Sequence, residues 1–294
     1  MKMTYISRIQ ANLKRFQTVH ARRKTNQVLD GSYRSMFKGR SMNFDELREY
    51  VQGDEIKDMD WKASARSRKL LVRQYIAERK HNIMLIMDTN KRMLADSDGK
   101  EEKRELALMS AGTMAYLVNR NGDFISATYA TKTSVNHFPF KSGLGNIEMI
   151  LENYHREVTM DNESDINSAL EYVIRNFKRR MIILIVTDVR GINAISDRNL
   201  KRLLVAHDVL LINVSDVSLE GRDVYELEEE SYMPAFFTKD KQFTEYTRNK
   251  TRELIDAAEE KLKHFGIPSA TVDYLDELDR EIIALLEKHK LEKR

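Results

Sequence analysis

The sequence predicts an α/β protein with a doubly wound, mostly parallel sheet, preceded by a small N-terminal α+β extension. Four short, largely apolar runs of strand length carry this prediction, and they span residues 83–87, 181–186, 209–214 and 267–272. Continuous apolar runs are typical of parallel strands that are buried on both faces. Helical patterns separate the runs, and strands that alternate with helices predict a sheet whose functional site lies at the carboxyl ends of the strands.

Composition narrows the possible classes of protein. The 294 residues are 41% hydrophobic, which is enough to bury a substantial core. Cysteine is absent, which excludes disulfides, zinc–thiolate sites and thiol nucleophiles and indicates a reducing cytoplasm. No apolar run reaches the roughly 18 residues that a membrane span needs, so we expect a cytoplasmic protein. We expect an N-terminal region over residues 1–80 and an α/β domain over residues 81–290 with an inserted excursion near 220–243.

The N-terminal region begins with a basic segment. Residues 1–40 hold ten lysines and arginines against one acidic residue, Asp30. Ile6, Ile9 and Leu13 recur at spacings of three and four, which predicts a helix over residues 3–24 that packs on its own domain. Binding of this basic helix to nucleic acid or to an anionic membrane surface stays open as an alternative. Residues 31–42, rich in Gly and Ser, predict an exposed loop or hairpin.

The stretch from 44 to 75 is densely charged and contains the single tryptophan. Helical spacing over 44–51, a turn at Gly53 and Asp54 and a strand over 70–75 are expected. The acidic residues Asp54, Asp58 and Asp60 are interpreted as helix caps or partners of arginines rather than cation ligands. We expect Trp61 to anchor the segment by burial.

The remaining elements follow in alternation. We expect helices at 102–119, 143–155, 165–176 (capped by Ser164), 197–205 and 278–286, and a hairpin of strands at 124–130 and 133–140. Residues 225–241 interrupt the alternation and predict an exposed excursion of short strands, with 233–237 as a contact patch.

Two aspartates mark the expected site. Asp88 and Asp188 each follow an apolar strand, and neighbouring parallel strands would bring both to one rim of the sheet. Carboxylates with nearby hydroxyls suit a hard cation such as Mg²⁺. Capping of the following helices by the same two aspartates is an equally good explanation of the pattern.

The charged stretch carries a family resemblance. The order Gly53-Asp54, then Asp60-Trp61, then Ser64-Ala65-Arg66, preceded by Phe44, Leu47-Arg48 and Tyr50, resembles the signature of the "domain of unknown function 58" proteins. The resemblance extends over about residues 31–290 and implies a von Willebrand factor A-like fold for the α/β domain. We expect the signature to act as a structural brace, formed by Arg48, Gly53, Asp54, Asp60, Trp61, Ser64 and Arg66.

The resemblance also implies a metal-ion-dependent adhesion site, with the pattern Asp-x-Ser-x-Ser, a Thr on a later loop and a final Asp. Asp88, Asn90, Ser164 and Asp188 match these positions and would hold any Mg²⁺. Arg92 stands where the second serine is expected. Because a guanidinium cannot ligate a cation and can pair with both aspartates, we predict a degenerate site occluded by Arg92.

The resemblance implies a non-enzymatic adaptor that works with a MoxR-type AAA ATPase in protein assembly or maturation, and no residue is assigned a catalytic role. One alternative is a Mg²⁺-dependent phosphohydrolase, since Asp88-Thr89-Asn90 and Thr187-Asp188 superficially resemble haloacid dehalogenase motifs. Asn90 cannot act as the acid/base that this chemistry needs. The other alternative is nucleic-acid or anionic-surface binding through the basic N-terminus.

Overall fold

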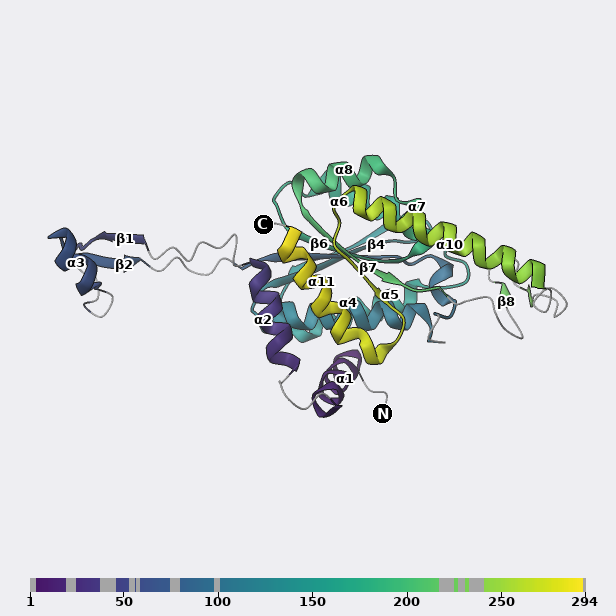
Figure 1. Ribbon diagram of the computed structural model, residues 1–294, viewed down its shortest axis with the longest axis horizontal. Coiled ribbons are helices and arrows are strands. Elements are labelled where there is room, and N and C mark those ends of the chain that lie inside the picture. Colours follow the sequence, from purple (N-terminus) through teal and green to yellow (C-terminus); the bar gives the residue numbers. More distant parts are fainter. Residues whose placement is uncertain are drawn as a thin grey trace.

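A six-stranded sheet forms the centre of the protein (Figure 1). The structure, a computed structural model, describes residues 4–19, 25–37, 46–52, 56, 59–74, 80–97, 101–216, 225–226, 231–232 and 241–292. The strand order is β10-β7-β6-β3-β4-β5, and every pair is parallel except β4 with β5. The strands are β3 (Asn82–Met87), β4 (Phe124–Ala130), β5 (Val135–Lys141), β6 (Ile182–Asp188), β7 (Asp208–Val214) and β10 (Ser269–Val272). This doubly wound order, with β3 and β6 central, confirms the predicted α/β fold class with a mostly parallel sheet.

Helices cover both faces of the sheet (Figure 1). Alternate residues of β3 show why: Ile83, Leu85 and Met87 enter one core, and Met84 and Ile86 enter the other. The first core is covered by α1 (Tyr5–Val19), α2 (Thr25–Phe37), α4 (Lys103–Arg120), α5 (Leu144–Glu157) and α11 (Leu278–Glu292). The second is covered by α6 (Ile166–Asn176), α7 (Val189–Ala194), α8 (Asp197–Ala206) and α10 (Lys241–His264). The sequence predicted these helices except α2, α7 and α10.

The first helix packs on the domain, as the sequence favoured. Ile6, Ile9 and Leu13 are buried in the first core, so the apolar stripe of α1 is covered by protein. The Glu148 carboxylate accepts hydrogen bonds from the Tyr5 and Ile6 amides at 2.8 and 2.9 Å, which satisfies the positive N-terminal end of the helix. An apolar stripe that is already buried cannot also insert into a membrane surface.

The second helix corrects a prediction. Residues 31–37, expected as a loop or hairpin, belong to α2, whose Leu29 and Tyr33 are buried against the domain. Tyr33 donates a 2.6 Å hydrogen bond to Asp123, and Asp30 pairs with Arg120 at 2.8 Å. Tertiary packing of these side chains outweighs the poor helix propensity of a stretch that contains Gly and Ser.

A small lobe consists of β1 (Glu46–Glu49), α3 (Trp61–Ser67) and β2 (Leu71–Gln74), with the two strands antiparallel. In Figure 1 it lies apart from the central sheet, at the left of the view. The strand expected near 70–75 is confirmed, but the helix expected over 44–51 is wrong for 46–49. Pairing with β2 gives this segment its backbone partners, among them a 2.8 Å bond from the Tyr50 amide to the Leu70 carbonyl.

The remaining elements are short. A 3₁₀ turn, η2 (Lys91–Leu94), follows β3, and another, η3 (Leu275–Glu277), precedes α11. The excursion contains the two-residue strands β8 (Tyr225–Glu226) and β9 (Ser231–Tyr232), which pair antiparallel, whereas residues 233–237 lie outside the described ranges. None of the helices in the described ranges is both long and apolar enough to span a lipid bilayer.

One buried carboxylate lies in the first turn of α11. The Asp279 side chain is buried, and neither of its oxygens has a hydrogen-bond partner among the described residues. Burial raises the pKa of Asp279 to about 6. The folded state therefore holds this proton more tightly than the unfolded chain does.

We predict that Asp279→Asn stabilises the protein at neutral pH. An aspartate in the unfolded chain has a pKa of about 3.9, so the wild type loses stability as pH rises from about 4 through 6. At pH 7 the variant should gain up to about 3 kcal/mol in the free energy of unfolding, and near pH 4 it should gain little. Urea unfolding at both pH values measures the difference. The exposed neighbour Glu277→Gln serves as the control, and an equal gain at pH 4 and pH 7 would contradict the explanation.

Candidate functional site

The carboxyl ends of β3 and β6 bring two buried carboxylates to one rim of the sheet. The strands are adjacent and parallel, with Met87 opposite Val186, and the Asp88 amide bonds to the Val186 carbonyl at 2.9 Å. The side chains of Asp88 and Asp188 are 1% and 0% exposed. The two aspartates therefore meet where the apolar runs predicted that they would.

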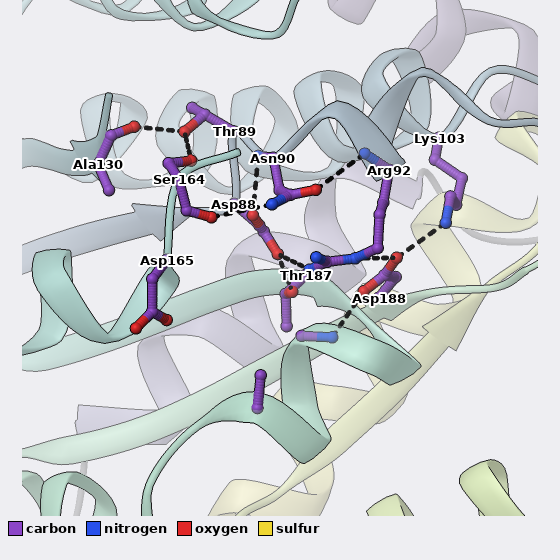
Figure 2. Close-up of polar contacts among 12 residues, drawn as sticks. Asp88, Thr89, Asn90, Arg92, Lys103, Ala130, Ser164, Asp165, Thr187 and Asp188 are labelled. Atoms are coloured by element: carbon purple, nitrogen blue, oxygen red, sulfur yellow. Dashed lines mark hydrogen bonds and ion pairs between the residues drawn. The ribbon is translucent and has the colours of Figure 1, made fainter. Parts of the chain in front are cut away.

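Arg92 lies between the two carboxylates (Figure 2). Its Nη2 is 3.3 Å from Asp88 Oδ2 and its Nε is 3.5 Å from Asp188 Oδ2. The Asn90 side chain starts the η2 turn by accepting a 3.1 Å hydrogen bond from the Arg92 amide, which orients the arginine toward the rim. The guanidinium thus has the position expected for a counter-charge.

A second cation, which the sequence reasoning missed, completes the cluster. Lys103 is the first residue of α4, and its Nζ lies 2.8 Å from Asp188 Oδ2 and also bonds to Asp216, just beyond β7. The lysine side chain is 1% exposed and that of Asp216 is 28% exposed. A lysine in the first turn of a helix opposes the helix dipole, and this was the available signal that Lys103 has a specific partner.

The charges of the cluster alternate through space. Burial would raise the pKa of Asp188, but Lys103 and Arg92 outweigh it and hold that pKa below its usual value. Burial would lower the pKa of Lys103, but Asp188 and Asp216 raise it instead. Burial and the charge of Asp188 raise the pKa of Asp88 despite Arg92. Asp188 and Lys103 are therefore a charged pair at neutral pH.

Several neutral groups fix Asp88. The Thr187 hydroxyl donates to Asp88 Oδ2 at 2.7 Å, and the backbone N–H of Asn90 donates to Asp88 Oδ1 at 3.0 Å. The Tyr154 hydroxyl donates to the backbone carbonyl of Asp88 at 2.9 Å. Gly191 packs against both aspartates, and its backbone N–H donates a 2.7 Å hydrogen bond to Asp188 Oδ1. A Cβ at Gly191 would lie 1.9 Å from the Thr187 hydroxyl oxygen and 2.8 Å from Asp88 Oδ2, so only glycine fits.

Asn90 and Ser164 lie at the same rim, but their oxygens are engaged within the protein. The side-chain nitrogen of Asn90, Nδ2, donates to the Ser164 backbone carbonyl at 3.0 Å. The side-chain oxygen of Asn90 accepts from the Arg92 backbone N–H. The Ser164 hydroxyl is 2.9 Å from that of Thr89, as Figure 2 shows. The predicted helix cap at Ser164 is wrong, because Asp165 caps α6 by accepting a 2.9 Å bond from the Asn167 amide. A carboxylate caps better here because it also complements the helix dipole.

This arrangement does not fit a divalent cation. Its two buried carboxylates face an arginine and a lysine, and the oxygens of Asn90 and Ser164 are bonded elsewhere. Within the described ranges, no group of three or more His, Cys, Asp or Glu side chains could hold a metal ion. The Arg92 guanidinium lies between the two carboxylates, at the position that a cation bound by both would take.

The signature residues of the lobe divide into two groups. Asp60 caps α3 by accepting bonds from the Lys62 and Ala63 amides at 3.1 and 3.0 Å, and buried Ser64 accepts a 2.8 Å bond from the Leu71 amide. These contacts tie α3 to β2. Arg66 is exposed, the Arg48 guanidinium bonds to the Glu49 carbonyl, and Gly53 and Asp54 lie outside the described residues.

The predicted burial of Trp61 is wrong, because its side chain is 62% exposed. It lies at the start of a seven-residue helix in which Ser64 is the buried residue. Among the described residues of the lobe, Ser64 and Val72 are the buried ones, and they form no core large enough to cover an indole. Five other large apolar residues of the lobe are exposed as well: Leu47, Tyr50, Val51, Ile56 and Leu70. All but Leu47 lie in the connection between the two strands, and an apolar surface of this kind is typical of a contact site.

The family described as "Protein of unknown function DUF58" matches residues 46–230. Uncharacterized proteins Rv1480 of Mycobacterium tuberculosis and Mb1516 of Mycobacterium bovis are each 29% identical over 209 residues, which is 69% of this chain and 63% of theirs. The chain thus spans less than two thirds of the length of these relatives.

The chain is also similar to solved structures at low sequence identity. BatB from Bacteroides thetaiotaomicron has 15% identity and a TM-score of 0.47, covering 71% of this chain and 98% of its own. A von Willebrand factor type A protein from Catenulispora acidiphila has 10% identity and a TM-score of 0.40, covering 75% of this chain and 44% of its own.

We predict that Gly191→Ala destabilises the protein by about 1–3 kcal/mol, because the added methyl group displaces Thr187 and Asp88. Thermal unfolding measures the change. Gly145→Ala is the matched control, since a Cβ there meets no atom within 4 Å and alanine favours the α5 helix. Equal effects of the two substitutions would contradict the close packing at Gly191.

The two neighbouring signature residues should behave differently. Asp60→Ala removes the cap of α3 and should cost about 1 kcal/mol of local stability, seen as faster hydrogen exchange at the Leu71 amide. Trp61→Ala should leave that exchange and the global free energy of unfolding within about 0.5 kcal/mol of wild type, because the indole is exposed. A large loss of stability in the Trp61 variant would restore the brace interpretation.

Proposed function

The chain belongs to the DUF58 family, and from this premise we propose that it is a non-enzymatic protein-interaction module, an adaptor for a MoxR-type AAA ATPase in the assembly or maturation of other proteins. The ATPase is the partner that the family resemblance implies. A reducing cytoplasm suits a chain of this composition, which has no cysteine.

The closed ion-pair cluster at the rim is the observation that carries this proposal. Both carboxylate oxygens of Asp88 accept hydrogen bonds, one from the Thr187 hydroxyl and one from the backbone N–H of Asn90. Arg92 also donates to this carboxylate. A carboxylate so engaged is a poor nucleophile or general base, since its lone pairs are taken and its movement is restricted. The cluster is therefore better suited to recognition than to catalysis.

The lobe supplies a second argument for an interaction role. Trp61 is 62% exposed and is accompanied by exposed Arg66 and Arg68. Tryptophan, tyrosine and arginine are the residues that contribute most to binding energy at protein interfaces. We assign the lobe to the ATPase contact and the rim to recognition of an acidic group.

Isothermal titration of the purified chain with the MoxR-type ATPase of the same organism tests the proposal. We expect a complex, and we expect Trp61→Ala to weaken it at least about tenfold without lowering the melting temperature, as loss of a central aromatic anchor does. Tyr246→Ala is the matched control, because this α10 side chain is also 62% exposed. Absence of binding at tens of micromolar, or equal losses in both variants, would contradict the proposed function.

A further inference from the structure

The cluster at the rim has a fixed order of charges. It runs from Asp88 to Arg92, to Asp188, to Lys103 and to Asp216, with each cation shared by two carboxylates. With all five groups ionised, three negative and two positive charges leave a net charge of −1. Side-chain cations, attached to η2 and α4, thus neutralise the buried aspartates without an added ion.

The five side chains of this cluster differ in their exposure to solvent. The side chains of Asp88, Asp188 and Lys103 are at most 1% exposed, whereas those of Arg92 and Asp216 are 25% and 28% exposed. Asp188 is further held by the Gly191 amide and by Arg92. Within the described ranges, Lys103 is the ion-pair partner of Asp216. Asp216 is therefore the carboxylate that can leave the cluster with the least rearrangement.

We propose that Asp216 is an internal ligand that closes the rim in the free protein, and that a carboxylate side chain of the partner replaces it on Lys103 without a divalent cation. This inference rests on the proposed interaction function and deepens it by naming the group that is recognised. The exchange breaks one ammonium–carboxylate pair and forms another, so no covalent bond changes and the net charge of the cluster stays at −1.

The burial of Lys103 explains why the incoming group carries a negative charge. The Lys103 ammonium is 1% exposed and has lost its hydration, so its charge is balanced by the carboxylates of Asp188 and Asp216. If Asp216 left without a replacement, Asp188 would be the remaining carboxylate on this buried cation, which is costly. A neutral amide or hydroxyl does not restore this balance. A single carboxylate does, and it has the size of the group that it replaces.

Chemical rescue in the isolated chain tests the exchange. Asp216→Ala removes the internal carboxylate and should lower the melting temperature by roughly 5 °C, as expected when a buried cation loses a partner. Acetate at 50 mM should recover a large part of this loss in the variant, whereas 50 mM chloride should not, and the wild type should respond equally to both salts. In the double variant Lys103→Met/Asp216→Ala, acetate should have no specific effect, because the cation is gone.

Three outcomes would overturn the inference. They are no specific acetate effect on Asp216→Ala, an equal effect in the double variant, or recovery by chloride as large as that by acetate. If Asp216→Ala does not fold, Asp216→Ser leaves a slightly smaller cavity, retains a polar side chain and is judged by the same criteria.

A separate measurement tests the claim that no cation is needed. The melting temperature of the wild type should be the same in 5 mM MgCl₂ and in EDTA, and a shift between them would overturn this part of the inference. None of these measurements uses the ATPase. Rescue without complex formation would therefore count against the proposed function alone, and complex formation without rescue would count against the carboxylate exchange alone.

Discussion

Two aspartates buried at the ends of adjacent strands impose the constraint on which this structure depends. Like charges in a medium of low polarity repel strongly, and each also loses its hydration. The protein meets both costs with Arg92 and Lys103, which contact the carboxylates from η2 and from the start of α4. These two elements lie where they can bring a cation to the aspartates. Glycine is required at 191 because its backbone N–H donates to Asp188 and a Cβ there would collide with Thr187 and Asp88.

A cation supplied by a side chain differs from a bound ion in its thermodynamics. An ion binds by mass action, so a site that uses one responds to its concentration. Arg92 and Lys103 are always present, and breaking such a buried pair by removing one partner is costly because the other charge remains. The rim is thus coupled to folding rather than to metal supply, which is consistent with the engaged oxygens of Asn90 and Ser164.

The features that the sequence predicted are those set by local pattern. Apolar runs identified the sheet because its central strands are buried on both faces, and the family resemblance placed Arg92 at a position of the expected metal-site motif, beside the two aspartates. Lys103 and Asp216 are 113 residues apart, and a pairing over such a separation leaves no local pattern. The α2 helix was missed because packing of Leu29 and Tyr33 stabilises it, and Trp61 was misjudged because residue type alone does not tell whether a core exists to cover it.

The packing of α2 against α11 has a consequence for synthesis on the ribosome. Residues 25–37 emerge early, yet the helix that covers them comprises residues 278–292, and α1 likewise bonds through Asn12 to the Leu275 carbonyl. At typical elongation rates of roughly 5–20 residues per second, α2 waits more than about ten seconds for α11. During that interval the face of α2 that packs on α11 is uncovered, so a chaperone has its greatest opportunity to act before α11 appears.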